Sequence, residues 1–179
     1  MNPIVPSVNN ILSALTILAE IMSAGLLLAI VSKGKILGTY KDAVSRNVLW
    51  VGFFVSLAAI SGSLFYSEVA KYAPCVLCWY QRIFMYPQPI LFLLAIIKKE
   101  KSILPYAFAL SIIGGAIAFF HYYGQIAKES ILPCSALGYS ASCAEKFVLQ
   151  YGYITIPMMA FSAFLLIALS IFATRGNKK

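Results

Sequence analysis

The stretch APCVLCWYQRIFMYPQP, residues 73–89, places two cysteines and an arginine at the start of an apolar segment. The chain around it is 61% hydrophobic and only 11% charged, and its mean hydropathy is +0.84. This composition leaves too little polar surface to cover a soluble core, so the sequence predicts a membrane protein. Ionisable groups inside membrane segments are costly, which makes this stretch the first candidate for a functional site.

Apolar segments of the chain are long enough to cross a hydrocarbon layer, which takes about 20 helical residues. They are residues 11–31, 48–67, 79–97, 103–123 and 153–173. Because the connections are short, we expect an all-α membrane protein. It divides into an extra N-terminal transmembrane helix with a basic cytoplasmic loop, residues 1–47, and a four-transmembrane-helix bundle, residues 48–179. No Lys or Arg precedes the first segment and no small-x-small cleavage site follows it, so we expect it to be retained rather than removed as a signal peptide.

Basic residues gather at one set of segment ends, and such residues mark the cytoplasmic side of a membrane protein. They are Lys33, Lys35, Lys41, Arg46, Lys98, Lys99, Lys101, Arg175, Lys178 and Lys179. This pattern predicts an N-terminus outside and a C-terminus in the cytoplasm. The net charge of +8 follows from that topology, so lipid is expected as a partner and nucleic acid is not.

The four cysteines, Cys75, Cys78, Cys134 and Cys143, all fall at the opposite, outer ends. That placement indicates an oxidising compartment. Four cysteines permit three pairings. Local spacing favours Cys75 with Cys78 and Cys134 with Cys143, since the segment CSALGYSASC encloses small and polar residues that bend freely. A disulfide in this outer loop would be accessible to a partner protein.

Cys78 is predicted to lie at the beginning of a transmembrane helix, just after the break introduced by Pro74. Free N–H groups and the helix dipole favour a thiolate there. Arg82 follows four residues later, on the same helical face and about 6 Å along the axis. Both effects predict a lowered pKa for Cys78, although an arginine at this depth is also compatible with a simple interfacial cation.

His121 is the only histidine and lies two residues from the outer end of its segment, at the depth of Cys78 and Arg82. A functional role and a hydrogen-bonded structural role are both compatible with that position. Gln81 lies at the same level. Further along the third segment, Pro87 and Pro89 remove backbone donors and predict a kink, with Gln88 bonded to a freed carbonyl.

Glu20 falls near the middle of the first segment, where an ionised carboxylate is costly. We expect it to be protonated or paired against the bundle.

The segments PCVLCWYQR, residues 74–82, and PCSALGYSASC, residues 133–143, resemble those of the DsbB/BdbC disulfide bond formation proteins. The resemblance covers residues 48–173, with both cysteine pairs in the same order and on the same side. It implies a thiol:quinone oxidoreductase of the bacterial cytoplasmic (inner) membrane. Such an enzyme reoxidises an extracytoplasmic, DsbA-like thioredoxin-fold protein and passes two electrons to ubiquinone or menaquinone.

The same resemblance implies a role for each cysteine. Cys134, paired with Cys143, is attacked by the reduced partner. Electrons then pass to Cys75 and Cys78 through a transient bridge between Cys75 and Cys143. Cys78 is the sulfur that faces the quinone.

The resemblance also implies that Arg82, His121 and Gln81 surround the quinone. Gln81 stands where some members carry an acidic residue, which predicts different proton handling. The extra N-terminal helix and the short gap between Cys134 and Cys143 are further differences.

Other interpretations predict different chemistry. A vitamin K epoxide reductase-like protein also combines a loop pair with Cys-x-x-Cys, but there the loop pair comes first. A non-enzymatic bundle would use both disulfides as staples. A Cys₄ zinc site would need paired short knuckles and free thiolates, so we expect no metal.

Overall fold

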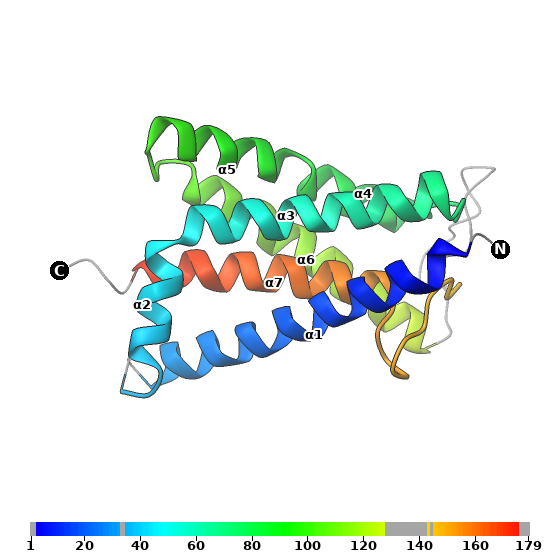
Figure 1. Cartoon of the computed structure of the whole chain (residues 1–179), viewed down its shortest axis with the longest axis horizontal. Coiled ribbons are helices and arrows are strands. Elements are labelled where there is room, and N and C mark those ends of the chain that lie inside the picture. The colour runs from blue at the N-terminus through cyan, green and yellow to red at the C-terminus, as the bar shows by residue number, and fades with distance from the viewer. Residues whose placement is uncertain (1–2, 33–34, 128–142, 144, 176–179) are drawn as a thin grey trace.

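The computed structural model describes residues 3–32, 35–127, 143 and 145–175. Helices account for most of this part of the chain and no strand is found in it, so the predicted all-α membrane fold is confirmed. In chain order they are α1 (Ile4–Val31), α2 (Gly38–Arg46), α3 (Val48–Leu64), the π-helix η1 (Phe65–Val69), α4 (Val76–Met85), α5 (Pro87–Lys98), α6 (Leu104–Ala127) and α7 (Ile156–Arg175). Apart from α2, they run along a common long axis (Figure 1).

Helical runs long and apolar enough to cross a membrane match four of the predicted segments. They are Ile4–Val31, Val48–Val69, Leu104–Ala127 and Ile156–Arg175. The remaining segment, residues 79–97, is divided between α4 and α5. The division falls at Tyr86, directly before Pro87, because proline cannot supply the hydrogen bond that would continue α4. The division confirms that the third segment is interrupted at its prolines. The amide of Gln88 donates to the carbonyl of Phe84 at 3.0 Å and not, as expected, to a carbonyl that Pro87 or Pro89 frees.

A short helix, α2, occupies the connection that we expected to be a basic loop. It lies across the end of the bundle from which the C-terminal part of α7 emerges (Figure 1). The hydroxyl of Tyr40 donates to the carbonyl of Met22 at 3.0 Å, and Val44 is buried against the bundle. The sequence did not predict α2, because the groups that Tyr40 and Val44 contact lie on other helices.

The helices α6 and α7 pack closely because Gly114 has no side chain. A Cβ atom there would collide with the ring of Phe164, which is fully buried between the two helices. Close packing of this kind fixes how α6 lies against the rest of the bundle.

Helix α1 is attached to α7 through the carboxylate of Glu20. It accepts hydrogen bonds from the hydroxyl of Tyr153 at 2.9 Å and from that of Ser162 at 3.1 Å. The expectation that Glu20 is paired against the bundle is therefore confirmed.

Two opposite ends of the bundle carry different chemistry. The beginning of α4 and the end of α6 lie at the end where the N-terminus is found (Figure 1). The helix α2, the C-terminal end of α5 and that of α7 lie at the other end. The cysteines of α4 are therefore separated from most basic residues by the length of the bundle.

Candidate functional site

The Cys-x-x-Cys pair lies where α4 begins. Cys75 is the residue that caps α4, and Cys78 is in its first turn. Their Sγ atoms are 3.3 Å apart, in hydrogen-bond contact, and both are free thiols. The disulfide that local spacing favoured is thus not formed in this structure. Only a small movement of the two sulfurs separates this dithiol from a disulfide.

His121 connects the pair to α6. Its side chain is only 2% exposed, and its Nδ1 atom accepts from the amide of Gln81 at 2.9 Å. The proton of the neutral ring therefore lies on Nε2, which is 3.1 Å from the carbonyl oxygen of Cys143 and 3.6 Å from the Sγ of Cys75. The histidine thus links both cysteine-bearing segments, and Gln81 selects its tautomer.

Cys143 lies directly beside this pair. The side-chain ligand atoms of Cys75, His121 and Cys143 all lie within 4.8 Å of one another. Cys143 is disulfide-bonded, and Cys134 lies outside the described residues. A sulfur in a disulfide is not a thiolate ligand, so this cluster is arranged for thiol–disulfide exchange rather than for a metal ion.

The cysteine with the lowered pKa is not the one that the sequence predicted. The hydrogen bond with Cys78 and, to a smaller extent, His121 together lower the pKa of Cys75 to about 4 against the opposing effect of burial. We had expected the lowered pKa at Cys78, from the helix dipole and Arg82. Cys75 has the lowered pKa instead because its sulfur lies 3.3 Å from the sulfur of Cys78 and 3.6 Å from Nε2 of His121. Cys75 is therefore the sulfur of the pair whose thiolate is favoured.

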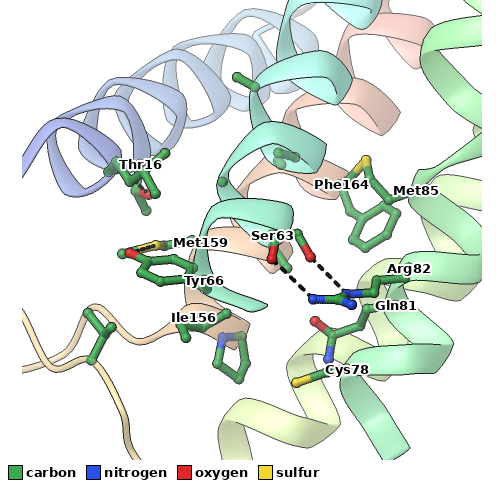
Figure 2. A pocket seen from close by; sticks show the side chains of 18 of the residues that line it. Thr16, Ser63, Tyr66, Cys78, Gln81, Arg82, Met85, Ile156, Met159 and Phe164 are labelled. Carbon is green, nitrogen blue, oxygen red and sulfur yellow. Dashed lines mark hydrogen bonds between the residues drawn. The ribbon is translucent and has the colours of Figure 1, made fainter. Parts of the chain in front are cut away.

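Arg82 turns from α4 toward α3. Its Nε donates to the hydroxyl of Ser63 at 3.0 Å and its Nη2 to the carbonyl of Ser63 at 3.1 Å (Figure 2). The guanidinium also lies over the ring of Trp79, 5.1 Å from its centre. Fixed in this way, the charge lies on the same side of α4 as Cys78, as the four-residue spacing predicted (Figure 2).

A cavity of about 480 Å³ opens between these residues and the helices α1, α3, α6 and α7. Its walls are largely apolar. The polar or sulfur-bearing residues that line it include Ser63, Tyr66, Cys75, Cys78, Gln81, Arg82 and His121. The structure therefore brings together every predicted site residue that it describes.

Two residues that hold the site together were not predicted from the sequence. Gln125 donates to the carbonyl of Glu145 at 2.9 Å, so α6 holds the segment after Cys143 one turn beyond His121. The four-residue spacing from His121 was a usable signal for it. Ser63 had no comparable signal, because its contact with Arg82 joins residues far apart in the chain.

Residues 45–174 match the family model for the disulfide bond formation protein DsbB. The chain belongs to the DsbB family. It is 45% identical to the SPbeta prophage-derived disulfide bond formation protein B of Bacillus subtilis, over 64% of this chain and 76% of that protein. It is 36% identical to the disulfide bond formation protein C of the same organism, over 73% and 94% of the two chains.

A probable disulfide formation protein C 1 of Bacillus cereus is 38% identical over 77% of this chain and 99% of its own length. No solved structure gave a significant match. Membership of the DsbB family identifies a disulfide oxidoreductase, and the apolar helices place it in a membrane. The sulfur cluster around Cys75 is accordingly its candidate active site.

Proposed function

We propose that this protein is a thiol:quinone oxidoreductase of the bacterial cytoplasmic membrane. It takes two electrons from the dithiol of an extracytoplasmic, DsbA-like thioredoxin-fold protein and passes them to a membrane quinone. One observation carries the proposal: Cys75 contacts His121 beside Cys143, and both sulfurs of the Cys75–Cys78 pair line a largely apolar cavity together with Arg82. The pair thus lies between the loop cysteine Cys143 and a site that can hold a second reaction partner.

The outer reaction begins at the loop disulfide of Cys134 and Cys143. A thiolate of the partner protein attacks Cys134, which forms a mixed disulfide and releases Cys143 as a thiolate. Cys143 then attacks Cys75 in an oxidised Cys75–Cys78 pair, so a Cys75–Cys143 bond forms and Cys78 leaves as a thiolate. The short distance among Cys75, His121 and Cys143 supports this step.

The partner completes the exchange with its second thiolate. That thiolate attacks the mixed disulfide, which releases the oxidised partner and Cys134 as a thiolate. Cys134 attacks Cys143, which restores the loop disulfide and releases Cys75. The pair of Cys75 and Cys78 then holds both electrons, and the low pKa of Cys75 makes it a good leaving group.

The cavity beside Cys78 fits a quinone. A volume of about 480 Å³ is within the usual range for small-molecule sites, and apolar walls suit an aromatic ring with a lipid tail. Arg82 would hold a carbonyl oxygen, because both of its bonds to Ser63 leave Nη1 as a donor. When bound, a quinone supplies an acceptor for two electrons and two protons. Cys78 lines the cavity where those electrons leave the protein.

The arrangement of the bundle supports the predicted orientation. We propose that the end with Cys75 and His121 faces outward, and that the end with Lys98 and Arg175 faces the cytoplasm. In this proposal residues 48–179 form the catalytic bundle, and residues 1–47 are an addition to it.

A direct assay tests the proposed function. The purified protein in detergent is mixed with a reduced thioredoxin-fold protein and either a short-chain benzoquinone or a short-chain naphthoquinone, and quinone absorbance is followed. We expect turnover with at least one quinone. No turnover with either, or turnover that persists in Cys134→Ser, would contradict the relay and favour disulfides that only staple the loops.

A further inference from the structure

Helix α1 ends at Val31, before the matched family region begins at residue 45, yet it forms one wall of the cavity. We propose that α1 is part of the quinone site and determines which quinone the enzyme accepts. The inference rests on the proposed function, since it concerns the ligand of the same cavity.

One face of α1 is turned toward the cavity. The residues on it are Leu12, Leu15, Thr16, Leu18, Ala19 and Met22. They recur mainly at intervals of three and four positions, as residues on one side of a helix do. Figure 2 shows the side chain of Thr16 on this face. Its hydroxyl donates to the carbonyl of Leu12 at 2.8 Å, so no polar hydrogen is left for a ligand and the wall is apolar.

The same face approaches the part of α3 that binds Arg82. A Cβ atom at Gly62 of α3 would lie 3.1 Å from a methyl carbon of Leu12, so α1 and α3 are in close contact there. Gly62 precedes Ser63, the residue that holds the guanidinium of Arg82. A ligand bound to Arg82 therefore extends along α1, where its ring substituents and tail meet α1 side chains.

Specific bonds hold α1 in place as a wall. Glu20 accepts hydrogen bonds from Tyr153 and Ser162 on one side, and the hydroxyl of Tyr40 donates to Met22 on the other. A lipid chain against the same opening would have no fixed position. A fixed wall gives a cavity of constant width, which is what discrimination between ligands of different size requires.

Photolabelling of the unaltered protein tests the contact. A short-chain benzoquinone or naphthoquinone with a photoreactive azide on its tail is irradiated in the site, with excess unlabelled quinone as competitor. We expect competable labelling of the peptide that contains Leu12, Leu15 and Ala19. Labelling confined to α3, α4 and α7 would overturn the inference.

A pair of substitutions on the same helix tests selectivity. Ala19→Phe fills the cavity from α1, whereas Ala14→Phe makes the same change on the exposed face. We expect Ala19→Phe to raise the quinone KM about tenfold and to change the ratio of KM values between benzoquinone and naphthoquinone, and Ala14→Phe to do neither. Equal KM values for both variants and the unaltered enzyme would contradict a role of α1.

Two readouts keep this result distinct from failure of the proposed function. If the unaltered protein reduces no quinone, the proposed function fails. Thiol exchange with the reduced partner, measured in a single turnover without quinone, should be unchanged in Ala19→Phe, which shows that the variant is folded. If Ala19→Phe is misfolded, Leu15→Ala replaces it, with Leu27→Ala on the exposed face as its control. We expect Leu15→Ala to change the KM ratio as well, and an unchanged ratio would count against the inference.

Discussion

The two sides of the first turns of α4 differ in what they offer a sulfur atom. On one side, Cys75 is 4% exposed and lies in a compact polar cluster with His121 beside Cys143. On the other, Cys78 lines a largely apolar cavity with Arg82, whose guanidinium is held by Ser63. Cys75 and His121 also line this cavity, so the two sulfurs differ in their close contacts and not in access to it. In the proposed mechanism, Cys75 exchanges with Cys143 and Cys78 passes electrons to the quinone.

Removal of either sulfur should have the largest effect. We expect Cys75→Ser and Cys78→Ser each to reduce quinone turnover to the rate without enzyme, because each side then lacks its reacting atom. The variants should differ in thiol exchange: Cys78→Ser should still exchange with Cys143, and Cys75→Ser should not. Mass spectrometry of alkylated protein measures the exchange with Cys143. Equal exchange in both variants would show that Cys75 and Cys78 do not have different roles.

Loss of His121 should weaken the exchange side in a pH-dependent way. In His121→Gln the pKa of Cys75 should rise, because one of the influences that lower it to about 4 is removed. The thiolate exists above its pKa, so alkylation of the reduced variant should be slowed about tenfold or more near pH 5 and much less near pH 9.

Tyr123→Gln, on the exposed face of the same helix, serves as the control for His121→Gln. Its alkylation rate should follow that of the unaltered protein at every pH. A pH profile of His121→Gln that also coincides with the unaltered one would show that His121 does not act on Cys75.

Arg82 should affect only the cavity side. We expect Arg82→Ala to raise the quinone KM by about tenfold or more, since a charge-assisted hydrogen bond contributes roughly 1.5–3 kcal/mol, while thiol exchange at Cys75 stays unchanged. Arg46→Ala, an exposed arginine on α2, is the control. Slowed thiol exchange with an unchanged quinone KM would show that Arg82 acts on Cys75 and not on the quinone.

Ser63 should have the smallest effect, because it acts through Arg82. Ser63→Ala removes the hydroxyl acceptor but keeps the carbonyl acceptor, so we expect the quinone KM to rise about threefold to fivefold. Ser61→Ala is a close control, since its hydroxyl is bonded within α3 and exposed. Equal KM values for the two serine variants would mean that Ser63 does not position Arg82.

The sequence was informative wherever a feature is local along the chain. The apolar lengths predicted the membrane helices, Pro87 predicted the break between α4 and α5, and the four-residue spacing predicted that Cys78 and Arg82 share a side. The depth of His121 in its segment predicted that it lies near the cysteines, and this is confirmed.

Features that depend on distant residues were missed or misplaced. The low pKa was predicted for Cys78 because only the helix dipole and Arg82 were visible in the sequence. It belongs to Cys75 because of Cys78 itself and of His121, which lies on another helix. Ser63, the partners of Glu20 and the cavity wall formed by α1 likewise follow from packing between helices.

Disulfide mapping in a variant that carries both Cys78→Ser and Cys134→Ser tests the central claim most directly, because neither removed thiol can then attack a bond between Cys75 and Cys143. The side-chain sulfurs of these two cysteines lie within 4.8 Å of one another. After mild oxidation with diamide, the account predicts that digestion without reduction yields a peptide in which Cys75 is joined to Cys143. Recovery of both cysteines as free thiols, under conditions that join Cys75 to Cys78 in the unaltered protein, would contradict it.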